Sequence, residues 1–530
     1  MEQVGCSHCL IFFCCCFTFI SSVQCLNEEG EALLSLLSLW KSVPTLVSSS
    51  WNASASTPCS WTGVGCNNET HQVVSLQLPG MKISGRLGEE IGKLSSLQVL
   101  DLSNNSLVGE VPTQLGNCTF LETLDLSVNG FSGMIPGSFK NLQKLIFLNL
   151  FSNSLTGEIP ESLFTITSLR YLFLNSNNLT GSISRKIGEL TEVLQLYLHS
   201  NQLSGTIPES VGNCSKLQDF YLDGNQLVGQ IPDTISSLKN LVNLGLSKNN
   251  LDGIIPMGLG NLKNLSYLDL SFNVFNGGIP EELGYCSNLS TLAIINCNLT
   301  GIIPSSFGLL RNLSYLDLSE NSLSGGIPPE LGECKNLTTL FLYTNQLEGK
   351  IPEEMGNLTN LQDLELFENM LSGEIPLSIW KNPSLEYAIF YRNNLSGELP
   401  HEITELKNLK NVSLFENQFS GIIPQGLGIN SSLLLIDFTN NKFSGTIPPN
   451  LCHGNKLEVL VVGQNQFNGS IPAGLGNCSS LQRMTFRQNN LSGTLPEFFK
   501  SHNLSYLDIS QNYVAGPIPN SLGLCLSLTF

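Results

Sequence analysis

Acidic and aromatic residues recur at related positions between residues 315 and 437. The acidic members are Asp317, Glu320, Asp363, Glu365, Glu368, Glu416 and Asp437. The aromatic members are Tyr315, Phe341, Tyr343, Phe367, Tyr387, Tyr391 and Phe415, and the one basic residue among them is Arg392. Carboxylates attract cations, and aromatic rings give rigid contact area to Lys and Arg side chains. We predict that this set binds a basic partner without covalent chemistry, although Asp in Leu-Asp-Leu-Ser segments, as at Asp317, is also compatible with a purely solubilising role.

Two arginines follow, Arg483 and Arg487, on either side of Thr485. Alternate residues of a strand face the same side, so both guanidinium groups are expected on one surface. A guanidinium binds a carboxylate bidentately. We predict that Arg487, supported by Arg483, binds the free C-terminal carboxylate of a basic peptide whose body lies on the acidic residues. The alternative, in which these arginines pair with Asp508 on the next strand, stays open.

A repeat must position these residues. Asn105 in LDLSNNSLVGEVP (100–112) has equivalents every 24 residues, and a further one arrives one residue early at Asn512. The equivalents are Met81, Asn129, Asn153, Asn177, Asn201, Asn225, Asn249, Asn273, Cys297, Asn321, Asn345, Asn369, Asn393, Asn417, Asn441, Asn465 and Asn489. This period is typical of an α/β leucine-rich repeat solenoid, a right-handed superhelix of stacked coils. Residues 71–530 then hold about 19 repeats plus a truncated one.

Within one coil, the leucines point inward and the alternate residues face outward on a concave surface. The residues two, four and six before each repeat Asn take these concave positions, and the residue one before it lies at their edge. We expect each repeat Asn to bind backbone groups left bare between coils, forming a ladder that Cys297 interrupts. The following Leu-x-Gly-x-Ile-Pro segment, as at 155–160, places Gly at a tight turn.

The composition excludes some classes of function. The 530 residues carry a formal net charge of -18, which opposes nucleic-acid binding because phosphates require Lys and Arg. No His shares a repeat strand with Ser or Cys in a catalytic triad, and His199 alone occupies a concave position. Glu365 and Glu368 on an open surface lack the pocket that a glycosidase needs. We expect no enzyme activity, cofactor or metal in this chain.

Residues 1–25 are predicted to be a signal peptide, because an apolar run at 9–20 is followed by small residues and is shorter than the ~20 residues needed to span a bilayer. Residues 26–70 are predicted to form an N-terminal capping domain. Its helix has an acidic first turn at Glu28, Glu29 and Glu31, followed by an apolar face. That face consists of Leu33, Leu34, Leu36, Leu37 and Trp40.

The cysteines fall into groups by position. Cys59 and Cys66 are predicted to form a disulfide in the cap, since a metal site would need two further ligands and only His71 is near. A second bridge between Cys452 and Cys478 is an open possibility. Cys478 also belongs to a group that takes the place of a Leu and is expected to be buried as thiols: Cys118, Cys214, Cys286, Cys334, Cys478 and Cys525.

Asn-x-Ser/Thr sequons are frequent and predict N-glycosylation in the secretory pathway. They include Asn52, Asn68, Asn117, Asn178, Asn264, Asn336, Asn394 and Asn503. Asn411 falls at a concave position, where a glycan would obstruct the acidic surface.

Three features carry a resemblance to a known family. Leu-x-Gly-x-Ile-Pro in 24-residue units, after a cap with a Trp and a Cys pair, resembles the plant-specific leucine-rich repeats of receptor-like kinases. The cap start at 25–27 (CLN), PPNLCHG at 448–454 and NNLSGTLPE at 489–497 are similar to receptors for the endogenous danger peptides called Pep. The chain departs from a complete receptor because it shows neither a membrane helix nor kinase motifs.

The resemblance implies the extracellular, ligand-binding domain of a plasma-membrane receptor kinase. It would bind a basic secreted peptide by its C-terminal end and signal in plant defence with a leucine-rich repeat co-receptor kinase. Seven coil steps of ~4.8 Å from the Asn321 repeat to the Asn489 repeat give ~34 Å, or roughly ten extended residues. The alternatives are a receptor-like protein or secreted decoy, and a leucine-rich repeat inhibitor that binds a pathogen protein. The uncharged segment 522–530 favours a chain that continues beyond Phe530.

Overall fold

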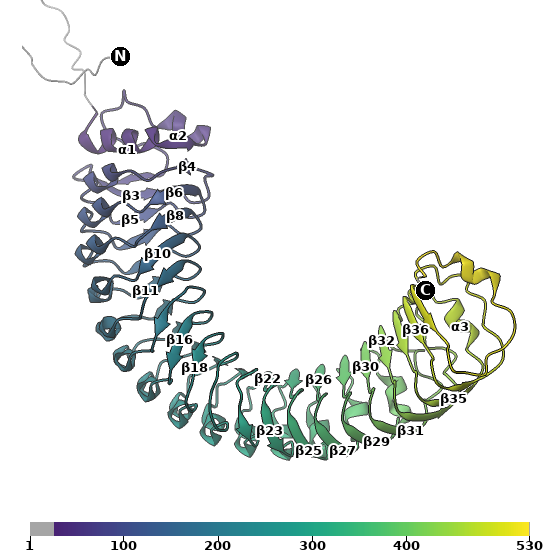
Figure 1. The fold of residues 1–530 in the computed structure, drawn as a ribbon. Coiled ribbons are helices and arrows are strands. Elements are labelled where there is room, and N and C mark those ends of the chain that lie inside the picture. Colours follow the sequence, from purple (N-terminus) through teal and green to yellow (C-terminus); the bar gives the residue numbers. More distant parts are fainter. Residues whose placement is uncertain (1–25, 529–530) are drawn as a thin grey trace, which may run out of the picture.

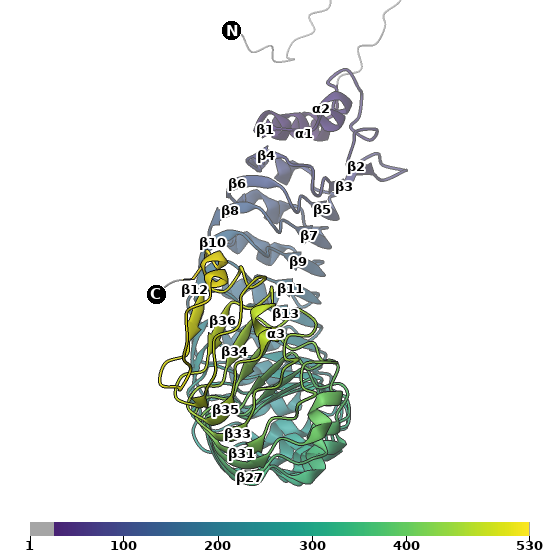
Figure 2. The ribbon, with the colours of Figure 1, turned by 90° about the vertical axis from the view of Figure 1, so that its right-hand side faces the viewer.

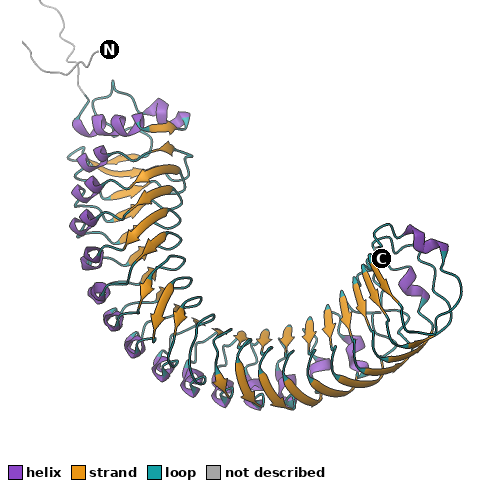
Figure 3. Ribbon diagram, viewed as in Figure 1, coloured by secondary structure: helices purple, strands orange, loops and turns teal. Residues whose placement is uncertain are grey.

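The protein is described by a computed structural model that covers residues 26–528. Two perpendicular views show a curved stack of coils with the cap at one end and the last coils at the other (Figures 1 and 2). Strands line the inner side of the curve, and short helices lie along the outer side of the N-terminal coils (Figure 3). The solenoid predicted from the 24-residue period is confirmed, whereas the predicted signal peptide lies outside the described residues.

The cap closes the first coil. It contains α1 (Glu28–Ser38), β1 (Trp40–Ser42), α2 (Thr45–Ser50) and β2 (Val64–Cys66). The side chain of Asn27 accepts a hydrogen bond from the Gly30 N–H and so caps α1, whose predicted apolar face is buried at Leu33 and Leu36. Strand β2 pairs antiparallel with the first strand of the concave sheet, and β1 pairs antiparallel with the first lateral strand.

One short strand per coil forms the concave sheet. Consecutive strands pair in parallel at a register shift of 24 residues, except the last pair, β36 and β38, whose shift is 23 residues. The strands are β3 (Val73–Gln77), β5 (Val99–Asp101), β7 (Thr123–Asp125), β9 (Phe147–Asn149), β11 (Tyr171–Phe173), β13 (Gln195–Tyr197), β15 (Asp219–Tyr221), β17 (Asn243–Gly245), β19 (Tyr267–Asp269), β20 (Thr291–Ala293), β22 (Tyr315–Asp317), β24 (Thr339–Phe341), β26 (Asp363–Glu365), β28 (Tyr387–Ile389), β30 (Asn411–Ser413), β32 (Leu435–Asp437), β34 (Val459–Val461), β36 (Arg483–Thr485) and β38 (Tyr506–Asp508).

A second series of strands follows the repeat Asn on the lateral side. These are β4 (Ser84–Gly85), β6 (Ser106–Glu110), β8 (Gly130–Gly133), β10 (Ser154–Glu158), β12 (Asn178–Thr180), β14 (Ser204–Gly205), β16 (Gln226–Gly229), β18 (Asn250–Leu251), β21 (Thr300–Gly301), β23 (Ser322–Gly325), β25 (Gln346–Gly349), β27 (Met370–Glu374), β29 (Asn394–Glu398), β31 (Gln418–Ile422), β33 (Lys442–Gly445), β35 (Gln466–Gly469) and β37 (Asn490–Leu491). Short 3-10 helices, from η1 (Glu89–Lys93) to η15 (Asn520–Leu524), and α3 (Ala473–Gly476) complete the coils.

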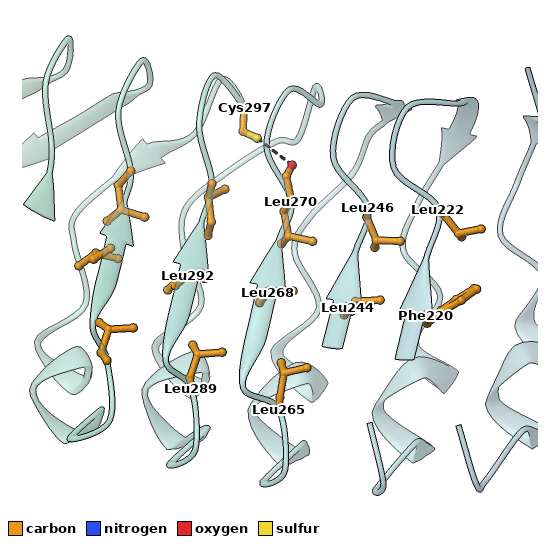
Figure 4. Close-up of a cluster of buried hydrophobic side chains, with 14 of the residues drawn as sticks. Phe220, Leu222, Leu244, Leu246, Leu265, Leu268, Leu270, Leu289, Leu292 and Cys297 are labelled. Atoms are coloured by element: carbon orange, nitrogen blue, oxygen red, sulfur yellow. Dashed lines mark hydrogen bonds between the residues drawn. The ribbon is translucent and has the colours of Figure 1, made fainter. Parts of the chain in front are cut away.

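The predicted asparagine ladder is confirmed. Asn369 Nδ2 donates to the carbonyls of Leu342, Leu366 and Phe367, and its Oδ1 accepts from the Leu347 N–H. Cys297 interrupts the series as expected: its thiol donates to the Leu270 carbonyl (Figure 4) and to the Ile295 carbonyl. A thiol offers no equivalent of Oδ1, so this coil loses the acceptor that the other ladder positions supply.

The residue before each repeat Asn is in the left-handed backbone region, with φ of 53° at Glu368, 52° at Arg392 and 55° at Glu416. This conformation is costly for residues with a Cβ, and the neighbouring coils impose it. It sets these side chains at one edge of the concave face, in a column that repeats from coil to coil.

The interior consists mainly of inward leucines, isoleucines and phenylalanines with almost no exposed area. Cys118, Cys214, Cys286, Cys334 and Cys525 are buried free thiols, as predicted. Burial raises the pKa of Cys118 to about 12, so it is an unreactive core residue. Among residues 26–528, no helix is long and apolar enough to cross a bilayer.

Candidate functional site

Four aromatic rings form a continuous stack on the concave face. The rings of Tyr343 and Phe367, Phe367 and Tyr391, and Tyr391 and Phe415 lie 4.3, 4.3 and 4.2 Å apart, with interplanar angles of 7°, 16° and 9°. All four residues are two before a repeat Asn, so the coil spacing itself brings them into stacking distance. We call Tyr343, Phe367, Tyr391 and Phe415 the ring stack.

The stack changes how the rings present themselves to a partner. The faces of Phe367 and Tyr391 are covered by neighbouring rings, so these two rings offer their edges to the concavity. A ring edge carries partial positive charge and does not attract cations. The faces of these two rings are therefore not open to a ligand cation, and the predicted contact with a peptide would be made by their edges. Phe341 lies on the N-terminal side of the ring stack but does not belong to it, because its ring centre is 6.0 Å from that of Tyr343 and the two rings are tilted.

A column of charged residues runs beside the ring stack. Arg392 Nη1 lies 2.6 Å from Glu368 Oε1, and Arg392 Nε lies 3.1 Å from Glu416 Oε2. Thr344 Oγ1 donates to the other oxygen of Glu368 at 3.0 Å. Glu368 and Glu416, two of the acids predicted to belong to the binding surface, each have a counterion within the chain. Sequence spacing placed them correctly and could not show this pairing.

Glu365 differs from these two acids. It is half-buried on β26 between Phe341 and Ile389, and no basic side chain among residues 26–528 forms an ion pair with it. Burial, followed by repulsion from Asp363 and Asp317, raises the pKa of Glu365 to about 7. An unpaired, partly desolvated carboxyl is where an incoming cation gains most, because the charge is poorly hydrated beforehand.

Asp317 and Asp437 have mainly local roles. Asp317 is 3% exposed and accepts hydrogen bonds from the Ser319 N–H and hydroxyl and from the Tyr315 hydroxyl. Asp437 accepts from the Thr439 N–H. Burial raises the pKa of both carboxyls. The acidic surface therefore has fewer available charges than its composition suggests.

Arg483 and Arg487 are both exposed on the concave face, in β36 and just after it. The Arg483 guanidinium lies 4.8 Å from the centre of the Tyr506 ring. Arg487 Nε donates to Gln511 Oε1 at 3.3 Å, which leaves its terminal nitrogens without a partner among residues 26–528. Asp508 accepts from the Ser510 N–H and pairs with neither arginine, so that alternative is wrong. On the N-terminal side, Gly463 presents no side chain beside Arg487.

An aromatic cluster in the N-terminal coils was missed by the sequence analysis. It consists of Phe147, Tyr171, Phe173, Tyr197, Tyr221 and Tyr267, joined by ring contacts of 4.6 to 6.4 Å. Applying the concave-position rule to the earlier repeats would have found it. Beside it, His199 Nε2 lies 3.0 Å from Asn175 Nδ2, and a hollow of about 390 Å³ is lined by these two residues and Phe173 and Tyr197, among others. Burial lowers the pKa of His199.

The structure joins Cys59 to Cys66 and Cys452 to Cys478, so the open question about the second bridge is resolved in favour of a disulfide. Cys478 is thus not a free thiol. The eight named sequon asparagines are all exposed, and Asn411 lies at the start of β30 on the concave face.

Comparisons with known proteins agree with this architecture. A leucine-rich repeat N-terminal domain matches residues 26–67, a leucine-rich repeat region matches 76–204, and leucine-rich repeats match eight segments between 216 and 525. The leucine-rich repeat receptor-like protein kinase PEPR1 of Arabidopsis thaliana is 53% identical over 92 residues, which are 17% of this chain and 8% of that protein. The chain thus matches less than a tenth of this relative's own length.

Solved structures match over nearly the whole chain. The crystal structure of PEPR1–AtPEP1 has a TM-score of 0.92 at 53% identity and covers 95% of this chain and 71% of that chain. The Arabidopsis receptor kinase HAESA, in complex with the peptide hormone IDA and the co-receptor SERK1, has a TM-score of 0.84 at 33% identity and covers 95% and 89%. Together with the matched cap and repeats, these relatives show that the chain belongs to the ectodomains of the leucine-rich repeat receptor-like kinases.

Proposed function

We propose that the chain is the extracellular part of a receptor kinase and binds a basic secreted peptide along its concave face. The observation that carries the proposal is Arg487, whose terminal guanidinium nitrogens have no partner among residues 26–528. Such a group suits a carboxylate, and the free C-terminus of a peptide supplies one at a chain end. The likeness to peptide complexes of PEPR1 and HAESA supports a peptide as the ligand class.

The body of the peptide would lie across the ring stack towards Asp363 and Glu365. The edges of the ring stack give flat apolar contact, and their partial positive charge suits the carbonyl oxygens of an extended peptide. A ligand cation would be held by the unpaired Glu365 rather than by a ring face. A longer peptide would continue to the N-terminal aromatic cluster.

A second part of the proposal concerns signalling. By its likeness to a receptor that is solved with the co-receptor SERK1, the complete protein would be held in the plasma membrane and would pair with a shorter leucine-rich repeat kinase on ligand binding. The resemblance of residues 25–27, 448–454 and 489–497 to receptors for danger peptides supports a role in plant defence.

The test compares Arg487→Ala with wild type by calorimetric titration of a ten-residue basic peptide in two forms, the free acid and the C-terminal amide. Wild type should prefer the free acid, and the variant should bind this form about 10- to 100-fold more weakly, because a hydrogen-bonded charge contributes about 1.5–3 kcal/mol. Binding of the amide should hardly change. Gln511→Ala, which removes the one partner of Arg487, is the matched control and should keep the preference. Equal losses for both peptide forms would remove Arg487 from this role.

A further inference from the structure

The charged column beside the ring stack contains an arrangement that looks like an occupied binding site. Arg392 reaches carboxylates in the coils on both sides, Glu368 at 2.6 Å and Glu416 at 3.1 Å. Its guanidinium carbon also lies 5.7 Å from the centre of the Phe415 ring. Two carboxylates and an aromatic ring would bind a Lys or Arg of a ligand on this surface. Arg392 of the protein itself already contacts all three groups.

The backbone explains why this contact forms. Glu368, Arg392 and Glu416 each precede a repeat Asn and share the left-handed conformation, so their Cα–Cβ bonds leave the coil in the same direction. Successive coils lie ~4.8 Å apart, which lets one guanidinium span both neighbours. Hydrogen bonds to these two carboxylates raise the pKa of Arg392, so it stays charged.

The neighbouring acids Asp363 and Glu365 differ from Glu368 and Glu416 in their pairing. Asp363 and Glu365 lie in the same coil as Glu368 but on β26, and neither has an ion-pair partner among residues 26–528. Lys410, which is close enough to affect Asp363, pairs with Glu386 instead. The surface thus has one group of carboxylates that is neutralised internally and another that is not.

We propose that Arg392 is an internal counter-cation that sets the register of the ligand. It fills the cation site between Glu368 and Glu416, repels a ligand cation in the coil of Asn393, and directs that cation to Asp363 and Glu365. This inference rests on the proposed function and adds a specificity rule to it. Each exposed ion pair is weak and exchangeable, so Arg392 biases the choice of position without blocking the surface.

The spacing between coils predicts how many residues separate the ligand cation from the C-terminal carboxylate of the peptide. From the coil of Glu365 to that of Arg487 is five steps, or ~24 Å, which about seven extended residues span. From the coil of Arg392 it is four steps, or ~19 Å, which corresponds to between five and six residues. A ligand cation is therefore expected about seven residues before the C-terminal residue of the peptide. A cation five to six residues before that residue is expected to be disfavoured.

The experiment is a lysine scan. Ten-residue Gly/Ser peptides with a free C-terminal carboxylate carry one Lys at successive positions, and each is titrated by fluorescence anisotropy into wild type and Arg392→Gln. Wild type should bind best with Lys about seven residues from the end. Arg392→Gln should gain about tenfold in affinity, the equivalent of 1.4 kcal/mol, for Lys at five to six, and little elsewhere.

Two further variants separate the explanations. Lys410→Gln removes one positive charge from the neighbouring ion pair with Glu386 and should produce no gain for Lys at five to six residues from the C-terminal residue. Glu368→Gln/Glu416→Gln leaves Arg392 without its partners and should weaken binding of Lys at five to six more than at seven. A loss of affinity at every position in Arg392→Gln would make Arg392 a direct ligand contact, and no change at any position would make it purely structural; either result overturns the inference.

The same scan distinguishes this inference from the proposed function. If wild type binds no peptide at any Lys position, the proposed function fails. The register rule requires a peptide bound to wild type, so it falls with the proposed function in that case. If wild type binds with the same affinity at all positions, peptide binding stands and the register rule falls.

Discussion

The acidic surface and the C-terminal end of the concave face, which carries Arg483 and Arg487, differ in how their charged groups are paired. In the coils of Asn369 to Asn417, Arg392 neutralises Glu368 and Glu416, and stacked rings cover one another's faces. Two coils beyond the acidic surface, the Arg487 guanidinium has one hydrogen-bond partner in the described part of the chain, the amide oxygen of Gln511. Composition alone makes the first region look like the stronger binding site. We therefore expect the groups without a counterion, Arg487 and Glu365, to offer a ligand more than the paired charges beside the ring stack do.

The ring stack is expected to matter more for stability than for binding. Phe367→Ala removes two stacked partners, Tyr343 and Tyr391, each worth about 0.5–1.5 kcal/mol beyond area burial, so a loss of about 1–3 kcal/mol is expected in urea unfolding. Phe341→Ala is the matched control, because its two ring contacts are at 6.0 Å and not parallel. An equal loss of unfolding free energy in both variants would show that parallel stacking contributes no more than tilted ring contacts. The two regions would then differ only in how their charges are paired.

Glu365 should make peptide binding depend on pH. Its pKa is raised to about 7, so the carboxyl is largely protonated at pH 5 and charged at pH 8. Affinity for a basic peptide should therefore rise over this range, about tenfold if the bound cation lowers the pKa by one unit. Titrations at pH 5, 6, 7 and 8 with wild type and Glu365→Gln measure the effect, and the variant should lose this rise.

The same carboxyl provides a check without ligand. Because burial disfavours the charged form, a folded pKa above the unfolded value reduces stability as pH rises from about 4.5 to 7. Glu365→Gln should thus melt at a higher temperature than wild type at pH 8, and the difference should become much smaller at pH 5 and vanish below about pH 4. A variant that melts lower at pH 8 would contradict the raised pKa.

The smallest effect on peptide affinity is expected at Tyr506, which contacts Arg483. Tyr506→Leu removes the ring over which the Arg483 guanidinium lies, and a cation–π contact at an exposed site is worth about 0.5–1 kcal/mol. Affinity for the free-acid peptide should fall about two- to fivefold, whereas Tyr506→Phe should bind as wild type does. If both variants bind like wild type, Arg483 does not support Arg487.

Several particulars were predictable because they depend on period alone. The 24-residue spacing predicted the coils, the ladder and its interruption at Cys297, and alternation along a strand placed Arg483, Arg487 and Glu365 on one face. The Cys59–Cys66 bridge was predictable because the two residues are close in sequence. The pairing of Arg392 was not, since any of the nearby acids was compatible with the same spacing.

Which residues share the concave face, and in what order, follows from the repeat alone, because a fixed period maps position in the chain directly onto position in space. Which of their charged and aromatic groups already have partners within the protein depends on the folded arrangement. Stacking of the rings at 4.2–4.3 Å, the left-handed residue before each repeat Asn and the bridge of Cys452 to Cys478 depend on side-chain directions across neighbouring coils. Those directions follow from contacts between coils, which no single repeat contains.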